Sequence, residues 1–556
     1  QVSERLMDSM DLEKERGITI SSKNGAFYFK DHLINIIDTP GHADFGGQVE
    51  RILKMCDGAL LLVDAVEGPM PQTYFVLKKA LENHLPIIVV INKIDKPNPR
   101  PEWVHDQVFD LFVKLQAPDD ILDFPMLYAS AKDGYAYDPH EENQNNLIPL
   151  FQKIIDFIPF PTGELNDPFS LLVSTINHSS FLGRLAIGKV TSGKININEE
   201  VSIIRNKEII HSTRITKIYH FNGPAMQEIE SAEVGDVIAL AGYDDIRVGD
   251  SFTNPKNPVF LEGFEVDPPT ISMNFIPNDS PFAGKEGQFV TSRHLGDRLH
   301  RESLSDVALV VDELPNNPGY KVSGRGELHL SILIEKMRRE GYEFQVTRPE
   351  VIFKKEDGKT LEPYEELTID VANDYGGSVI ANLGVRKGHM THMHEENGMT
   401  RLVYDIPTRG LLGFKSEFMN LTRGMGIMNY VFNGFSEYAG EIINRKNGAL
   451  ISKITGETVA YALFNLQERG KLFLGPGEKI YEGQIIGENA RENDLTVNPA
   501  KGKKLTNVRA SGSDENVVLT PPHKMNLEKT LAFINDDELV EITPKAIRIR
   551  KKYLLE

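Results

Sequence analysis

Two short polar motifs, each directly after an apolar run, constrain the fold of this 556-residue chain more than any other feature. Asp-Thr-Pro-Gly-His occupies 38–42 after the mostly apolar run Ile-Asn-Ile-Ile at 34–37, and Asn-Lys-Ile-Asp occupies 92–95 after the apolar residues 87–91. Such apolar runs predict buried parallel strands. Ligand loops gather at the carboxyl ends of parallel strands, so we expect both motifs to serve one ligand site on an α/β sheet.

The chemistry of the two motifs indicates a guanine nucleotide. The carboxylate of Asp38 can hold a water molecule of a bound Mg²⁺, and the N–H of Gly41 can contact a terminal phosphate. Asn92 and Asp95 suit a guanine, because the Asp accepts from both the ring N–H and the exocyclic amine, a pair of donors that adenine lacks. In this order and on strand ends, the motifs predict a guanine-nucleotide switch.

A third motif is missing from the sequence. The pattern G-x-x-x-x-G-K-[ST], whose N–H groups and Lys hold the β- and γ-phosphates, does not occur, and the chain begins at Gln1 without an initiator Met. We expect that the first strand, the phosphate loop and the first helix were cut away. The alternative is a GTPase that has lost its nucleotide site. Without the loop, we expect the chain to bind GTP poorly and to be inactive.

Composition narrows the class of protein further. The length suggests about three to five domains, and the sequence holds no apolar stretch near the roughly 20 residues that span a bilayer. The lone Cys56 is expected to be a small core residue in a reducing compartment. A net charge of −19 argues against indiscriminate nucleic-acid binding but permits local basic loops. We expect a cytoplasmic protein, with the plastid stroma as an alternative if a transit peptide precedes Gln1.

Strand and helix patterns predict a multidomain α/β and β fold. Alternating strands and helices indicate a truncated P-loop GTPase-type domain over 1–162, and short strands with Gly or Asn turns indicate a β-barrel over 163–262. Two segments with a split β-α-β rhythm indicate ferredoxin-like α+β domains over 263–352 and 353–437. The remainder, 438–556, is predicted to be a mostly β domain.

With these features in view, the chain resembles the TypA/BipA family of ribosome-associated translational GTPases over essentially its whole length. Residues 11–20 are similar to the first switch of the family, and 322–330 resemble the third domain shared with elongation factor G. Residues 501–512 are similar to the loop that marks TypA/BipA itself. Elongation factor G would carry an extended fourth domain where only 353–361 separates the two ferredoxin-like units.

The resemblance implies hydrolysis of GTP to GDP and phosphate, and assigns catalytic roles. Thr19 would ligate Mg²⁺ and touch the γ-phosphate, Asp38 would hold a Mg²⁺-bound water, and Gly41 would sense the γ-phosphate. His42 would orient the attacking water, with Ile18 as half of an apolar gate. Taken alone, Thr19 would be interpreted as an edge-strand residue and His42 as a structural histidine.

The resemblance also assigns the guanine contacts and the expected ligands, GTP or GDP with Mg²⁺. Asn92 and Asp95 would read the base while the stem of Lys93 lies along it. A backbone N–H of the final nucleotide loop would meet the guanine carbonyl. That loop consists of Ser130, Ala131 and Lys132.

The implied partner is the ribosome, with contacts to rRNA of both subunits and to tRNA in the A site. Lys501, Lys503, Lys504 and Arg509 are expected to contact RNA phosphates, against the alternative of a solvated charged face. We expect a monomer that binds neither membranes nor DNA. By resemblance, its role lies in ribosome assembly or translation under stress, including cold.

Two other functions remain open, a non-catalytic ribosome-binding scaffold and a translocase like elongation factor G. Two further tracts receive structural interpretations. The histidine-rich tract 389–394 resembles a metal-binding tract but is interpreted as an exposed hairpin loop. The closing basic tract 548–552 is interpreted as an edge strand with one charged face.

Overall fold

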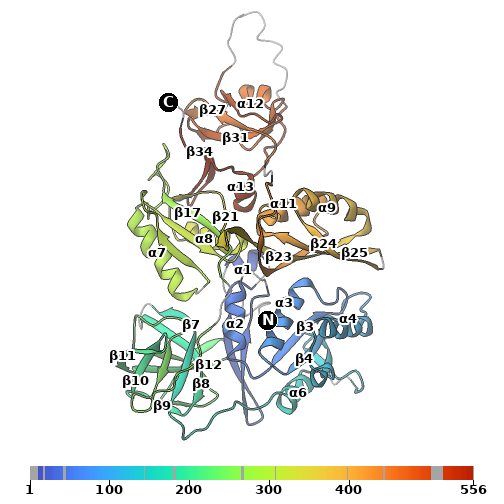
Figure 1. Ribbon diagram of the computed structural model, residues 1–556, viewed down its shortest axis with the longest axis vertical. Coiled ribbons are helices and arrows are strands. Elements are labelled where there is room, and N and C mark those ends of the chain that lie inside the picture. Colours follow the sequence, from blue (N-terminus) through green and yellow to red (C-terminus); the bar gives the residue numbers. More distant parts are fainter. Residues whose placement is uncertain are drawn as a thin grey trace, which may run out of the picture. The chain divides into compact units, whose positions relative to one another are not determined.

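The computed structural model describes residues 11–16, 19–41, 45–142, 145–179, 183–264, 268–306, 308–396, 398–442, 445–502 and 518–554 (Figure 1). The chain divides into two compact units. The first unit comprises residues 1–267 with 304–308, and the second comprises 268–303 with 309–556. Within the described residues, no helix combines the length and the apolar character that crossing a membrane requires.

The predicted α/β sheet is present in the first unit. Its strand order is β3-β4-β5-β6, with β3 parallel to β4 and β4 parallel to β5. All five apolar residues of β4 are buried, as expected for a strand covered on both faces. Helix α4 turns Val104, Val108 and Phe112 inward at a spacing of four residues. The elements are β3 (Ala59–Asp64), β4 (Ile87–Asn92), β5 (Met126–Ser130), β6 (Tyr135–Tyr137), α2 (Gly46–Leu53), α3 (Pro71–Glu82), α4 (Pro101–Lys114), α5 (Asp119–Leu122) and α6 (Ile148–Phe157).

An antiparallel ribbon precedes this sheet and contains the apolar run 34–37, so the prediction of a buried parallel strand there is wrong: the run is mostly half-buried and pairs antiparallel. It consists of β1 (Lys23–Phe29) and β2 (His32–Asp38), and the short helix α1 (Asp11–Arg16) lies before it in the chain. Ala26 of β1 exchanges two backbone hydrogen bonds with Gly223, in the turn after strand β12 (Lys217–Asn222). The ribbon is thereby joined to the β-rich part of the same unit.

The β-rich part is an eight-stranded antiparallel sheet of order β11-β10-β16-β7-β8-β15-β12-β13. Its strands share one core, which includes Leu171, Ile203 and Ile238, so the sheet curls around its apolar face. This curled sheet corresponds to the predicted β-barrel, although among the described residues its end strands β11 and β13 do not pair and the sheet does not close. The strands are β7 (Ser170–Ser179), β8 (Gly183–Ser192), β10 (Glu200–Arg205), β11 (Glu208–Arg214), β12 (Lys217–Asn222), β13 (Ala225–Ile229), β15 (Val237–Ala241) and β16 (Ser251–Thr253), with a separate pair β9 (Lys194–Asn196) and β14 (Ser231–Glu233).

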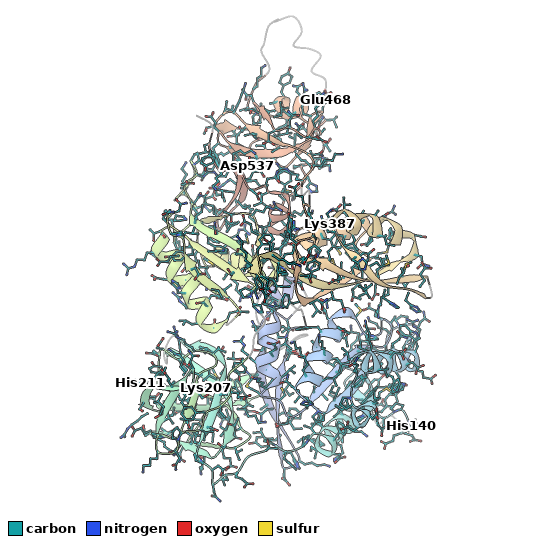
Figure 2. The ribbon with its side chains drawn as sticks, in the orientation of Figure 1. His140, Lys207, His211, Lys387, Glu468 and Asp537 are labelled. Carbon is teal, nitrogen blue, oxygen red and sulfur yellow. The ribbon has the colours of Figure 1, made fainter. Side chains whose placement is uncertain are left out.

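Edge strand β11 follows a tight turn in which Asn206 and Lys207 both have positive φ, the geometry that suits the twist of a two-residue hairpin. Figure 2 labels Lys207 and His211 on this hairpin. Elsewhere in the unit, Cys56 is half-buried, and burial, with a smaller effect from Asp57, raises the pKa of its thiol to about 12. This thiol is therefore neutral and unreactive at physiological pH.

The second unit is built on an eleven-stranded sheet that joins two regions far apart in the sequence. Strand β20 pairs with β33 in antiparallel register, with Phe344 opposite Ile542 and Val346 opposite Val540. The sheet therefore runs from the region predicted as 263–352 into the one predicted as 438–556. Its elements are β17 (Ile271–Pro277), β18 (Val310–Glu313), β19 (Tyr320–Gly324), β20 (Phe344–Val346), β21 (Glu350–Val351), β27 (Ala449–Ser452), β29 (Gly470–Leu472), β31 (Gln484–Asn489), β32 (Leu495–Val497), β33 (Glu538–Ile542) and β34 (Ile547–Lys551), with helices α7 (Ser292–Ser305), α8 (Glu327–Arg339), α12 (Ala460–Leu466) and α13 (Leu527–Phe533) and the pair β28 (Gly456–Glu457) and β30 (Lys479–Ile480).

The interpretation of the closing basic tract as an edge strand is wrong. Strand β34 pairs with β33 on one side and β31 on the other. Its arginines are accommodated because partners reach them: Arg550 donates to Asp279 at 2.7 Å, and Arg548 donates to Glu286 at 2.7 Å. The sequence pattern suggested that these arginines face water, but in the fold they are paired with carboxylates instead.

The remaining sheet of the second unit has the order β22-β23-β25-β24, with β26 also pairing with β23. Helices α9 and α11 pack on one face, where Val379 and Phe418 meet Leu367 and Leu402 (Figure 1). The elements are β22 (Lys354–Glu356), β23 (Lys359–Ala372), β24 (His389–Glu396), β25 (Met399–Pro407), β26 (Ile427–Glu437), α9 (Asn373–Val385), α10 (Thr408–Leu411) and α11 (Phe414–Leu421).

The histidine-rich tract 389–394 lies in strand β24, which pairs only with β25 among the described residues. The tract is exposed, as predicted, but it forms one strand of a hairpin and not its loop. The described residues contain no group of three or more His, Cys, Asp or Glu side chains placed to hold a metal ion.

Candidate nucleotide site

The structure brings together the two side chains predicted to serve Mg²⁺. Asp38 is the last residue of β2, and the hydroxyl of Thr19 donates to its Oδ2 at 3.4 Å. Hydroxyl and carboxylate oxygens are the kind of donor that Mg²⁺ takes. The described geometry is therefore compatible with the metal role predicted for both residues.

A buried carboxylate that the sequence analysis did not single out holds the segment around Thr19. Glu13 of α1 is fully buried, and its Oε1 accepts from the N–H groups of Ile20 at 3.0 Å and Ser21 at 3.1 Å. Lys23 Nζ lies 2.8 Å from the same oxygen. Burial alone would raise the pKa of Glu13, but the bonds from Lys23 and the two backbone groups outweigh it and lower the pKa. Glu13 therefore stays ionised and ties the residues after Thr19 to α1.

The guanine side of the site is organised by Asn92. Its Oδ1 accepts from the N–H of Lys93 at 2.8 Å and from the N–H of Ala131 at 2.9 Å. Lys93 has a φ of 66°, a left-handed conformation that is uncommon outside glycine. One side-chain oxygen thus fixes the turn that begins at Lys93 and joins it to the loop at Ala131.

The second connection between these loops runs through Ser130. This buried residue ends β5, and its Oγ lies 2.9 Å from Asp95 Oδ1 and 2.9 Å from Asp133 Oδ2. A single hydroxyl proton serves one carboxylate at a time, while the oxygen also accepts from the N–H of Asp133. The carboxylate of Asp95 is thereby positioned but remains exposed, as does Lys132.

A further acidic residue, Asp64, stabilises the turn at Lys93. The sequence analysis did not identify it as a site residue. It ends β3, directly opposite Asn92 in the parallel ladder. Lys93 Nζ lies 3.0 Å and Lys96 Nζ 2.9 Å from its Oδ2. Burial raises the pKa of Asp64, yet hydrogen bonds from Val66 N–H and the two lysines lower it well below its usual range. Its position could have indicated this role, because Asp64 directly follows the apolar run 59–63, just as Asp38 follows the run 34–37.

Several predicted residues cannot be placed. His42, Lys503, Lys504 and Arg509 lie outside the described residues. Gly41 is described, and a Cβ added to it would meet Gln72 Oε1 at an ordinary 3.5 Å. A larger side chain would therefore fit at position 41, so steric crowding does not explain the glycine there.

Comparison with known proteins first identifies the class. Residues 1–160 match the elongation factor Tu GTP-binding domain, 183–253 match elongation factor Tu domain 2, and 359–446 match the elongation factor G C-terminus. Together with the α/β sheet and its strand-end loops, these matches define a translational GTPase. A fourth match, to the TypA/BipA C-terminal domain, covers 447–556.

Curated relatives then specify the family. The large ribosomal subunit assembly factor BipA of Salmonella typhimurium is 52% identical over 558 residues, covering 100% of this chain and 92% of the relative. The proteins of the same name in Escherichia coli K12 and Haemophilus influenzae are 52% and 51% identical, covering 92% and 90% of those proteins and 100% of this chain. The chain belongs to the TypA/BipA family of translational GTPases, as the sequence motifs predicted.

A solved structure supports the fold alone. The crystal structure of a protein from Thermus thermophilus aligns with a TM-score of 0.52 at 15% identity, covering 78% of this chain and 91% of that one.

Proposed function

We propose that this protein is a ribosome assembly factor that acts on the large ribosomal subunit and hydrolyses GTP to GDP and phosphate. The observation that supports this most is the 52% identity, across the whole chain, to relatives named large ribosomal subunit assembly factor. The arrangement of Asn92, Asp95, Ser130 and Ala131 at the ends of β4 and β5 supports guanine-nucleotide control of that activity.

Guanine recognition follows from the geometry of these two loops. The exposed carboxylate of Asp95 accepts from the ring N–H and the exocyclic amine of guanine, while Ser130 keeps it from rotating away. Asn92 holds the N–H of Ala131 in the loop whose backbone meets the guanine carbonyl. The stem of Lys93, anchored to Asp64 through its Nζ, lies along the base.

Phosphoryl transfer depends mainly on positioning and on neutralising charge. Thr19 and Asp38 would hold Mg²⁺, which supplies positive charge next to the phosphates when bound. Gly41 offers an N–H toward the γ-phosphate, and His42 orients the attacking water. Because Glu13 ties Ile20 and Ser21 to α1, release of Thr19 on loss of the γ-phosphate would be transmitted to that helix.

Ribosome binding completes the proposal. Lys501, which is exposed, and Lys503, Lys504 and Arg509 would contact rRNA or A-site tRNA phosphates. We propose a cytoplasmic monomer built from the five domains predicted from the sequence, acting in ribosome assembly or translation under stress, including cold.

The test compares GTP with inosine triphosphate, which lacks the exocyclic amine, in the protein purified as its gene encodes it. Asp95 should favour GTP by at least tenfold, because a hydrogen bond to a charged group contributes about 1.5–3 kcal/mol. Asp95→Asn should remove that preference. Asp133→Asn is the matched control, since it changes the other carboxylate near Ser130 and should leave the preference intact. Equal affinities for both nucleotides in the unmodified protein would refute the proposal.

A further inference from the structure

Helix α12 lies between the two stretches of chain that bound residues 503–517. At its N-terminal end, the N–H of Val459 donates to the carbonyl of Pro499 at 3.0 Å. At its C-terminal end, Gln467 donates from Nε2 to the carbonyl of Val518 at 3.3 Å and accepts from the N–H of Thr520 at 3.0 Å. The ends of the helix are therefore bonded to Pro499 on one side of this segment and to Val518 and Thr520 on the other.

One face of α12 packs against the fold and the other carries aromatic rings. Ala462 and Leu463 are buried, and Leu466 packs on the cluster that contains Leu450 and Ile486. Tyr461 and Phe464, one helical turn apart, remain 39% and 38% exposed. Both rings thus present area to solvent side by side on the outward surface of the helix.

The surroundings of the two rings are mixed in character. Val518, beside Gln467, is 73% exposed and extends the apolar surface. Lys501 at one end of the helix and Arg469 at the other are exposed cations, while Glu468 is an exposed anion, labelled in Figure 2. Flat rings flanked by cations suit a ligand that has both π faces and phosphates.

We propose that Tyr461 and Phe464 form a stacking surface for unpaired RNA bases, with Lys501 and Arg469 meeting the adjoining phosphates. This inference rests on the proposed function, because it specifies how the C-terminal region meets ribosomal RNA. Aromatic stacking tolerates any base, since every base has a π face. The surface therefore selects unpaired RNA over duplex RNA, in which the base faces are already stacked.

The experiment measures binding of the protein, purified as its gene encodes it, to a fluorescein-labelled unpaired RNA oligomer and to the same strand in a duplex. Tyr461→Ala and Phe464→Ala should each weaken binding of the unpaired oligomer about tenfold, within the range of stacking on one base. Tyr461→Phe and Phe464→Tyr keep the rings and should bind like the unmodified protein. Tyr553→Ala, at an 80% exposed ring of the same unit, is the matched control.

A salt series distinguishes stacking from charge. The slope of log Kd against log salt should be the same for Phe464→Ala as for the unmodified protein, because the phosphate contacts remain. Unchanged affinity in both alanine variants, equal affinity for duplex and unpaired RNA, or a partner that proves to be a protein would each overturn the inference.

Ribosome co-sedimentation separates the two proposals. If the unmodified protein fails to bind ribosomes, the proposed function fails. If it binds ribosomes and both alanine variants bind the RNA oligomer normally, only the stacking surface fails. Melting temperatures within about 1 °C of the unmodified protein would show that the variants are folded.

Discussion

The paired strands β20 and β33 lie next to a buried network of hydrogen bonds. Its contribution to the free energy of unfolding can be measured by removing one oxygen atom. Tyr481 and Glu541 are both fully buried, and the Tyr481 hydroxyl donates to Glu541 Oε2 at 2.8 Å. Ser280 donates to Oε1 at 2.6 Å and Asn278 at 2.9 Å, while Arg548 lies 3.3 Å from the same oxygen. Tyr481→Phe therefore removes one of the partners of a buried carboxylate and leaves the others in place.

The expected cost is about 2 kcal/mol in the free energy of unfolding. A hydrogen bond to a charged group contributes about 1.5–3 kcal/mol, and the carboxylate keeps its remaining partners, which places the loss toward the lower end. For a unit of this size, that corresponds to a fall of about 3 °C in melting temperature. Backbone amides of β33 should lose protection from hydrogen exchange by the same free energy if they open with the whole unit.

The chain contains a single tryptophan, Trp103, which lies in the first unit and reports on that unit separately. Its fluorescence midpoint in urea should be unchanged by Tyr481→Phe, while calorimetry and hydrogen exchange register the loss in the second unit. Tyr553→Phe, at an exposed ring, is the control and should change neither. A loss below about 0.5 kcal/mol, or an equal shift at Trp103, would refute the reasoning.

The same pair gives a pH dependence with a defined sign. Burial, together with the neighbouring Glu541, raises the pKa of Tyr481 well above its ordinary value of 10. A raised pKa in the folded state means that the stabilisation is fully present below about pH 10 and is lost as the pH rises above it. The stability gap between the unmodified protein and Tyr481→Phe should therefore narrow in alkali. A gap that widens above pH 10 would contradict this assignment.

Three further outcomes are expected. Glu13→Gln should lower the hydrogen-exchange protection of the Ile20 and Ser21 amides about fivefold at neutral pH. In the unmodified protein this protection should fall as the pH drops below about 4.5, because the lowered pKa of Glu13 means that only its ionised form stabilises the segment. In Glu13→Gln that pH-dependent loss should be absent. His42→Ala should abolish ribosome-stimulated GTP turnover while GTP affinity stays within a few-fold; a large loss of affinity would contradict the role of orienting water. Neutralising Lys503, Lys504 and Arg509 together should weaken ribosome co-sedimentation and flatten its salt dependence, whereas unchanged binding would indicate a solvated charged face.

The local patterns of the sequence predicted the α/β sheet and the class of its ligand site. Apolar runs before Asp38 and Asn92 indicated strands, and the residues after them indicated what the strand ends could bind. Both signals are local, because strand burial and turn chemistry depend on neighbours within a few positions. The family assignment could be predicted for the same reason, since each motif is a short segment.

The residues that hold the site loops in place, and the pairing of strands from distant regions, could not be predicted in this way. Glu13 binds the N–H groups of Ile20 and Ser21, seven and eight positions along the chain. Asp64 binds the side chains of Lys93 and Lys96, which only the fold brings to it. Whether the eight-stranded sheet closes likewise depends on whether its end strands β11 and β13 pair, which no local pattern determines.

The closing tract shows most clearly what the sequence determined and what was left to the tertiary structure. Its alternation of Arg and Ile correctly predicted a strand at Ile547–Lys551. Whether that strand lay at an edge was decided by β31 and by carboxylates such as Glu286, more than 260 positions earlier in the chain than Arg548. A strand period is a property of adjacent residues, whereas the pairing of a buried charge is a property of the folded chain, because it requires a partner that only long-range packing supplies.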